Sequence, residues 1–169
     1  MSIYSPKIIL GIDPGYDRIG VGIIKRENNI DTYMYSECIT TDKSKSFADR
    51  LLEISISLTD IIEHYKPEIA VVEDLFFTSN QKTVIKVAEA RGVILLACQK
   101  SKLKIQELTP LQIKMSLVGN GRAEKSQVEM MVRQILKFKL DKRLDDELDA
   151  LAGALAYRDE YIDKYQLHR

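Results

Sequence analysis

The order of the apolar patterns along this chain is the feature that most constrains its fold. Five segments have the pattern of strands, at residues 7–13, 19–26, 30–40, 68–74 (EIAVVED) and 102–108 (KLKIQEL). The first three follow one another directly, and helical patterns separate the third, fourth and fifth. A meander followed by alternating helices and strands predicts an α/β fold, with a mixed five-stranded sheet flanked by helices.

The helical segments have recognisable starts. Apolar residues recur at spacings of three and four over residues 46–65, with Ser46 as the expected N-cap and Pro67 after the end. The sequence TPLQ predicts another start, with Thr109 as the cap. Further helices are predicted over residues 80–99, 124–137 and 146–164.

Length and composition limit the class of protein. At 169 residues the chain is expected to form a single domain over residues 1–169. Its longest near-apolar stretch, GVILLAC, is far shorter than the ~20 residues that span a bilayer, and the N-terminus has no secretion pattern. We therefore expect a cytosolic protein with no membrane partner, in which Cys38 and Cys98 are buried, reduced thiols.

The net charge is zero, from 25 basic and 25 acidic residues. Non-specific coating of nucleic acid depends on the neutralisation of phosphates, so this balance argues against that function class. A zero net charge remains compatible with a local basic groove beside an acidic centre. The two histidines, His64 and His168, are far apart in the sequence, which argues against a histidine metal cluster.

Two of the apolar strands end in carboxylates. Asp13 follows ILGI and precedes Pro-Gly, and Glu73 closes the run IAVV. Asp13 alone has a simpler explanation as a turn residue, whereas a buried carboxylate such as Glu73 requires a partner. Ligands bind outside the carboxyl ends of parallel strands, so the position of both acids indicates a functional edge. Asp74 is expected on the opposite face of the sheet, because side chains alternate along a strand.

The segment DDELDALAGALAY supplies two further acids. Asp146 and Asp149 share one face of the predicted helix with Ala150 and Gly153. The small residues of this helix allow it to approach the sheet closely. Acids near a helix start also favour the helix dipole, so this segment alone does not require a functional role.

Four acids would need a cation if they converge. They are Asp13, Glu73, Asp146 and Asp149, here called the acid cluster. Two like charges ~4 Å apart repel each other by about 4 kcal/mol at an effective dielectric constant near 20. Oxygen ligands without cysteine or histidine suit Mg²⁺ or Mn²⁺. Two such ions can activate a water and stabilise the leaving oxygen of a phosphodiester, so convergence would predict a metal-dependent hydrolase.

The chain resembles the bacterial RuvC Holliday-junction resolvases in three stretches, in the same order: ILGIDPGYDRIGVGII, VVEDLFFTSNQKTVIKVAEARGV and VGNGRAEKSQV…DDELDALA. The resemblance implies a ribonuclease-H-like fold and a homodimer that nicks two opposed strands of four-way junction DNA during recombination and repair. It also implies Mg²⁺-dependent hydrolysis that leaves 5′-phosphate and 3′-hydroxyl ends, and the RuvAB branch-migration complex as a partner. From the oxygen ligands we expect about two ions per active site, with Mn²⁺ as a substitute metal.

Carried onto matching positions, the resemblance implies that the acid cluster is catalytic and binds the metal. Asp146 matches the D-x-x-D-A-L-A spacing, whereas Asp145 would require a spacing of four. Phe76 matches an aromatic residue that stacks on a base unpaired at the crossover, a contact worth ~1–3 kcal/mol. The alternative is that Phe76 and Phe77 both belong to the core. Asp74 departs from relatives, which often have glutamine there, and is expected to lie off the site.

The loop VGNGRAEKS has basic residues on both sides. Lys114, Arg122 and Lys125 are predicted to contact DNA phosphates, and Lys125 is also predicted to offset charge that develops at the scissile phosphate. A plain interhelical loop is the alternative. On the helix over residues 80–99, which builds the dimer interface in the family, Lys86 and Arg91 fit a solvated face as well as a DNA contact, as does Lys82.

Three other functions are alternatives to this one. An actin-like ATPase or sugar kinase has a similar first phosphate loop, but it needs a second Asp-Gly-Gly loop, which does not occur here. Another ribonuclease-H-like nuclease that acts on RNA would have similar acids. A catalytically silent junction-binding protein would have no reason to keep repelling carboxylates beside phosphates.

Overall fold

The computed structural model describes residues 6–74, 81–137 and 145–159, and the structural statements below concern these residues. Its sheet has five strands in the spatial order β3-β2-β1-β4-β5. β1 pairs antiparallel with β2 and parallel with β4, whereas β2–β3 is antiparallel and β4–β5 is parallel. The predicted mixed five-stranded sheet is confirmed. The strands are β1 (Lys7–Asp13), β2 (Arg18–Glu27), β3 (Ile30–Thr40), β4 (Ile69–Glu73) and β5 (Lys104–Leu108).

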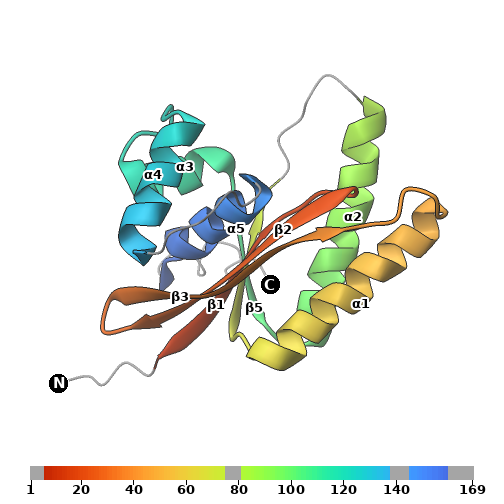
Figure 1. Ribbon diagram of the computed structural model, residues 1–169, viewed down its shortest axis with the longest axis horizontal. Coiled ribbons are helices and arrows are strands. Elements are labelled where there is room, and N and C mark those ends of the chain that lie inside the picture. Colours follow the sequence, from red (N-terminus) through yellow and green to blue (C-terminus); the bar gives the residue numbers. More distant parts are fainter. Residues whose placement is uncertain (1–5, 75–80, 138–144, 160–169) are drawn as a thin grey trace, which may run out of the picture.

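Helices cover both faces of this sheet (Figure 1). Buried side chains of α1 and α2 form one core with the strands, and those of α3, α4 and α5 form a second core on the other face. Within the described part of the chain, no helix has the length and apolar character needed to cross a membrane. The helices are α1 (Phe47–Tyr65), α2 (Gln81–Lys100), α3 (Pro110–Val118), α4 (Lys125–Leu136) and α5 (Asp145–Ala156).

Two helix starts follow their predicted caps. The Ser46 hydroxyl accepts a 3.2 Å hydrogen bond from the Asp49 backbone N–H at the start of α1. Thr109 and Gln112 form a reciprocal capping box at the start of α3. These bonds satisfy N–H groups that the first helical turn leaves without a partner.

The prediction that both thiols are buried is wrong for Cys38. Cys98 on α2 is buried, but Cys38 on β3 is half-buried, and both are free thiols. β3 is an edge strand, and among the described residues no further strand pairs with its outer side to enclose the thiol. The Cys38 Sγ lies 3.6 Å from an oxygen of Asp146.

The predicted helix over residues 146–164 is wrong at its C-terminal end, because α5 stops at Ala156. Residues 157 and 158 have no helical structure, and residues 160–164 lie outside the described residues. The reason lies in basic side chains that bind the last carbonyl groups of the helix.

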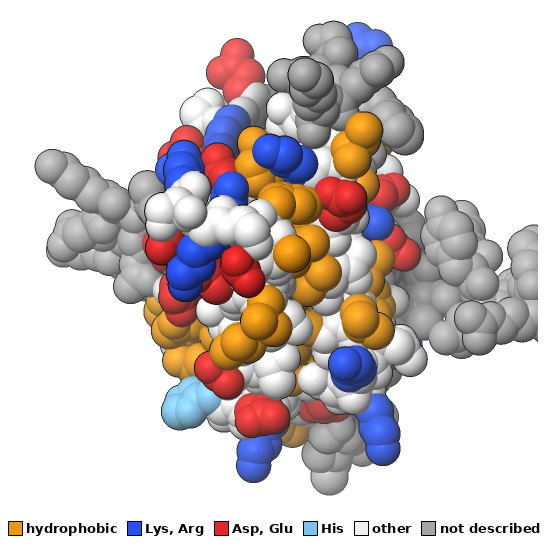
Figure 2. All heavy atoms as spheres, turned by 90° about the vertical axis from the view of Figure 1, so that its right-hand side faces the viewer, with side chains coloured by type: hydrophobic (Ala, Val, Ile, Leu, Met, Phe, Trp, Pro, Cys, Tyr) orange, Lys and Arg blue, Asp and Glu red, His pale blue; other side chains and the backbone are white. Residues whose placement is uncertain are grey.

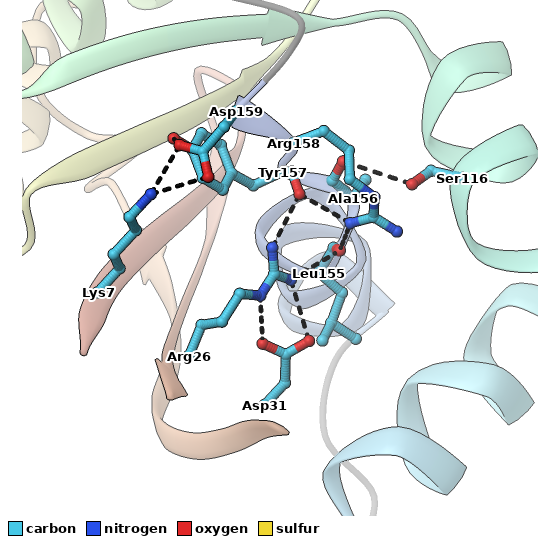
Figure 3. A network of polar contacts seen from close by, with 9 residues as sticks. All are labelled: Lys7, Arg26, Asp31, Ser116, Leu155, Ala156, Tyr157, Arg158 and Asp159. Atoms are coloured by element: carbon cyan, nitrogen blue, oxygen red, sulfur yellow. Dashed lines mark hydrogen bonds and ion pairs between the residues drawn. The ribbon is translucent and has the colours of Figure 1, made fainter. Parts of the chain in front are cut away.

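Figure 3 shows these contacts at the end of α5. Arg26 of β2 donates hydrogen bonds to the carbonyl oxygens of Leu155 (3.2 Å) and Tyr157 (2.9 Å), and a bidentate pair with Asp31 holds its guanidinium group. Arg158 donates to the same two carbonyl oxygens. These donors take the place of the N–H groups that a continuing helix would supply.

Glycines in the strands allow α5 to lie very close to β1 and β2. A Cβ at Gly11 would be 1.9 Å from the Ala150 carbonyl oxygen, and a Cβ at Gly20 would be 1.9 Å from the Asp146 carbonyl oxygen. Both positions therefore require glycine, because no side chain fits beneath the helix backbone. The close approach brings the acidic start of α5 against the sheet.

Candidate active site

Asp13 and Glu73 lie side by side at the carboxyl ends of two parallel strands. β1 and β4 are paired as far as Ile12 and Val72, and the two acids are the next residue on each strand. Ile12 and Val72 belong to the core under α1 and α2. Because side chains alternate along a strand, the acids point to the face that α5 covers.

α5 carries Asp146 and Asp149 to the same edge. Gly20 is the partner of Asp13 in the β1–β2 pair, and the Asp146 carbonyl oxygen packs against Gly20. Asp149 follows on the same face of α5, about one turn further along. Three elements that are distant in the sequence, β1, β4 and α5, therefore gather the acid cluster at one edge of the sheet.

The two strand acids are costly to ionise at this position. Burial is the largest cause that raises the pKa of Asp13 from 3.8 to about 7, followed by the charges of Asp149 and Asp146. Burial also raises the pKa of Glu73 from 4.5 to about 8, and the charges of Asp13 and Asp149 add to this effect. A cation in contact with these carboxylates would favour their ionised forms, so the electrostatics of the site favour cation binding.

Basic side chains of the protein already contact the helical acids. Arg18 Nη2 lies 2.5 Å from Asp146 Oδ2. Lys125 Nζ donates a 2.8 Å hydrogen bond to Asp149 Oδ2 and lies 3.6 Å from Asp145 Oδ2. These pairs link the start of α5 to the start of β2 on one side and to α4 on the other.

A cavity of about 180 Å³ opens beside Glu73 and Asp149. Lys114 of α3 and Lys125 of α4 contribute ammonium groups to its lining. Carboxylates that attract cations, together with ammonium groups that attract anions, suit a phosphate bound through metal ions. The remaining lining residues are Pro110, Ile113, Val128 and Ala152.

The family model described as crossover junction endodeoxyribonuclease RuvC matches residues 9–157. The chain belongs to the RuvC family. The crossover junction endodeoxyribonuclease RuvC of Petrotoga mobilis is 44% identical over 150 residues, which are 89% of this chain and 92% of that protein. The RuvC protein of Ruminiclostridium cellulolyticum is 44% identical over 154 residues, which are 91% of this chain and 93% of that protein.

Solved RuvC structures have the same architecture. The T. thermophilus RuvC in complex with a Holliday junction substrate has a TM-score of 0.83 at 30% identity, over 89% of this chain and 92% of that chain. The yeast mitochondrial Holliday junction resolvase Ydc2, at 12% identity and a TM-score of 0.63, shares the fold over 88% of this chain and 76% of its own. The predicted ribonuclease-H-like fold is confirmed by these neighbours.

Asp145 and Asp146 are the two candidates for the first α5 acid of the acid cluster in this RuvC-family chain. Asp146 contacts Arg18, and its charge is among the causes that raise the pKa of Asp13. Asp145 has a side chain that is 69% exposed, and it lies 3.6 Å from Lys125, farther than Asp149 does. The geometry therefore favours Asp146, as the motif spacing does.

The residues predicted to bind DNA differ in their distance from the acid-lined cavity. Lys114 and Lys125 both line the cavity beside the acids. Arg122 is exposed in the connection between α3 and α4, and it is not among the residues that line this cavity. Phe76 lies outside the described residues.

Asp74 lies off the site, in an ion pair on the α2 side of the sheet. Its Oδ1 is 3.1 Å from Arg91 Nη2, and Arg91 also pairs with Glu107 and donates a 3.3 Å hydrogen bond to the Glu73 carbonyl oxygen. The Arg91 side chain is only 13% exposed. Arg91 therefore ties α2 to the ends of β4 and β5, and the interpretation of this residue as part of a solvated face is wrong.

Arg18 is the site residue that sequence reasoning missed. It begins β2, and its ion pair with Asp146 places it directly beside the acid cluster. The available signal was its position close after Asp13 in the sequence, across a short Pro-Gly turn. Because the chain reverses direction at this turn, a basic residue just after it lies close to the strand end that carries the acid.

The donors of the acid cluster fit a hard divalent cation, because all of them are carboxylate oxygens. Among the described residues, no three histidine, cysteine, aspartate or glutamate side chains are close enough to hold a metal ion as they stand. The elevated pKa values of Asp13 and Glu73 nevertheless mark a place where positive charge is stabilising. RuvC-family membership implies a divalent-metal-dependent nuclease.

Proposed function

We propose that this RuvC-family chain is a structure-specific endodeoxyribonuclease that resolves four-way (Holliday) DNA junctions by paired symmetric nicks. The observation that carries the proposal is the meeting of carboxylates from β1, β4 and α5 beside a cavity with two lysines. Family membership supports the choice of substrate, because a solved RuvC relative is in complex with a Holliday junction. The action belongs to recombination and repair in the bacterial cytoplasm.

The acid cluster is proposed to hold Mg²⁺, about two ions per active site, with Mn²⁺ as a substitute. Bound ions of this kind supply an activated water and neutralise the leaving oxygen of a phosphodiester. The protein contributes the carboxylates, whose burial makes an accompanying cation strongly favourable. Lys125, beside Asp149, offsets negative charge that develops on the phosphate.

The DNA is proposed to approach through the cavity beside Glu73 and Asp149. Lys114 and Lys125 line that cavity and would contact backbone phosphates of the cleaved strand. Arg122, exposed between α3 and α4, would contact the DNA further from the acids. Phe76, on the segment that follows β4, would stack on a base unpaired at the crossover.

Two nicks require two active sites, and a homodimer supplies them by two-fold symmetry. Figure 2 shows hydrophobic side chains gathered over the face formed by α1 and α2. Each of the exposed residues Leu52, Ile56, Ile85 and Leu96 has more than half of its surface open to solvent. An apolar face of this kind supports α1 and α2 as the dimer contact.

The RuvAB branch-migration complex is proposed as a further partner, on family grounds.

The test compares three substrates: a synthetic four-way junction, a linear duplex of the same sequence, and an RNA hairpin. Each is incubated with Mg²⁺ or with EDTA. We expect paired, Mg²⁺-dependent nicks in the junction only. Preferential cleavage of RNA would replace the proposal with an RNA-directed nuclease of the same fold. Junction binding without turnover would make the chain a silent binding protein.

A pair of variants links the activity to the acids. Glu73→Gln keeps the size of the side chain and removes its charge, so we expect cleavage to fall at least about a hundredfold while junction binding remains. Glu68→Gln is the matched control. Glu68 is exposed and directly precedes the first residue of β4, at the end of the strand away from Glu73. Equal cleavage by the two variants would contradict the proposed site.

A further inference from the structure

A second cavity borders the acid cluster, on the side of Asp146. It has a volume of about 390 Å³, and none of its lining residues also lines the cavity beside Glu73. Asp146 and Asp149, on one face of α5, thus border one cavity each. The lining residues of the second cavity are Gly15, Tyr16, Asp17, Arg18, Lys43, Val87 and Asp146.

The β1–β2 connection that forms this cavity is held from behind by Arg50. The Arg50 side chain, only 9% exposed, forms a close ion pair with Asp17. It also donates 2.9 Å hydrogen bonds to the Tyr16 carbonyl oxygen and to the Thr41 hydroxyl. A buried guanidinium with this many partners fixes the connection in one conformation and compensates the Asp17 charge.

The compensation by Arg50 changes the charge balance of the cavity. The hydrogen bond from Arg50 is the largest cause that lowers the pKa of Asp17, so this carboxylate is ionised and already paired. Lys43 lies 3.4 Å from Asp17, and its side chain is 72% exposed. Lys43 is therefore a largely surplus positive charge that faces solvent at the cavity.

A second ammonium group lies beside Tyr16, one of the residues that line this cavity. Lys86 Nζ is 5.3 Å from the centre of the Tyr16 ring and 5.6 Å from that of Phe47. Contacts of a cation with two aromatic rings hold it near the cavity without neutralising its charge. Arg18 adds a third positive charge, paired with Asp146.

We infer that this second cavity binds a backbone phosphate of the DNA strand next to the scissile phosphate, through Lys43 and Lys86. The inference rests on the proposed function and extends the DNA path beyond Lys114 and Lys125. A strand cleaved at the acid cluster must continue away from it in both directions. Two lysines line the first cavity, on one side of the strand. On the other side, Lys43 lines the second cavity and Lys86 lies against the Tyr16 ring that lines it.

The experiment measures how junction binding depends on salt. Binding of a four-way junction is followed with Ca²⁺ in place of Mg²⁺, over a range of KCl concentrations. Each lost phosphate contact reduces the slope of log K against log[salt] by about 0.7–0.9. We expect this reduction for Lys43→Gln, about twice this reduction for Lys43→Gln with Lys86→Gln, and a wild-type slope for Lys43→Arg, which keeps the charge.

Lys45→Gln is the matched control. Lys45 is two positions from Lys43 and similarly placed on the surface, but it pairs with Glu53 and does not line the cavity. We expect its slope to equal that of the wild type. If wild-type protein cleaves junctions and the Lys43 and Lys86 variants keep its slope, the inference is wrong and the proposed function stands. If wild-type protein neither binds nor cleaves junctions, both are wrong.

Discussion

Lys125 and Asp149 form a 2.8 Å ion-paired hydrogen bond that joins the first residue of α4 to the inner face of α5. The same ammonium group lines the cavity beside Glu73. Its positive charge opposes the burial and the repulsion that raise the pKa values of Asp13 and Glu73. Lys125 therefore both anchors a helix and tunes the charge of the acid cluster.

Replacement of this lysine tests that dual role. For Lys125→Met we expect single-turnover junction cleavage to be about 10²–10³-fold slower, because a group that stabilises charge in the transition state is lost. Lys100→Met, an exposed substitution at the end of α2, is the control and should keep the wild-type rate. Cleavage by Lys125→Met at the wild-type rate would show that Lys125 has no part in the chemistry.

The acid cluster makes the stability of the metal-free protein depend on pH. The pKa values of Asp13 and Glu73 are higher in the folded protein than their ordinary values of 3.8 and 4.5, at about 7 and about 8. At pH values between the ordinary and the raised pKa values, the folded state therefore binds more protons than the unfolded state. The free energy of unfolding should fall as the pH rises from about 4 to about 8. For Asp13 alone the loss is on the order of 4 kcal/mol. Urea unfolding in EDTA across this range measures it.

A variant isolates the source of this pH dependence. Asp13→Asn cannot ionise, so its free energy of unfolding should fall less steeply with pH and should exceed that of the wild type near pH 8. Asp60→Asn, at an exposed position of α1, should keep the wild-type profile. Parallel profiles for wild type and Asp13→Asn would show that Asp13 is not the buried, repelled acid described here.

Divalent cations should reverse the destabilisation at high pH. A ligand that binds only the folded state stabilises it by about 2.7 kcal/mol at a hundred times its Kd. We expect Mg²⁺ to raise the melting temperature at pH 8, and to raise it much less at pH 5, where protons hold Asp13 and Glu73. The shift at pH 8 should be small for Glu73→Gln. A Mg²⁺ response of equal size at both pH values would place the bound ions elsewhere.

The close approach of α5 to the sheet is testable with two glycines in the same interface. Gly20→Ala would push a methyl group into the Asp146 carbonyl oxygen, so we expect a loss of about 1–3 kcal/mol of stability and slower cleavage. Gly153→Ala places its methyl group 3.8 Å from Val71, an ordinary contact, and should gain up to about 1 kcal/mol from helix propensity. Thermal unfolding of both variants measures the difference. Equal stability would contradict the packing.

Much of the fold followed from local pattern. The predicted strands over residues 7–13 and 30–40 have the observed bounds, and α1 begins directly after its predicted cap, Ser46. The acids of β1 and β4 could also be assigned to strand ends, because an apolar run and the turn after it are adjacent in the sequence. The i, i+3 spacing of Asp146 and Asp149 placed them on one helical face in the same way.

Other features could not be predicted by such patterns. The position of Arg18 close after Asp13 indicates the strand end where it lies but not its partner, Asp146, and nothing near Arg50 in the sequence indicates that it holds the β1–β2 connection. The requirement for glycine at positions 11 and 20 is equally non-local, since it arises from the backbone of α5. In each case the partner is an element that arrives from another part of the chain.

The sequence by itself determined where strands and helices begin and which acids stand at their ends, because side-chain periodicity and capping act among residues a few positions apart. Only the tertiary structure decided that α5 stops at Ala156, that its acids meet those of β1 and β4, and that a second cavity borders them. These features depend on contacts such as that of Arg26 with Tyr157, 131 positions apart. Such contacts exist only once helices and sheet have packed together, since burial and close approach create the interactions.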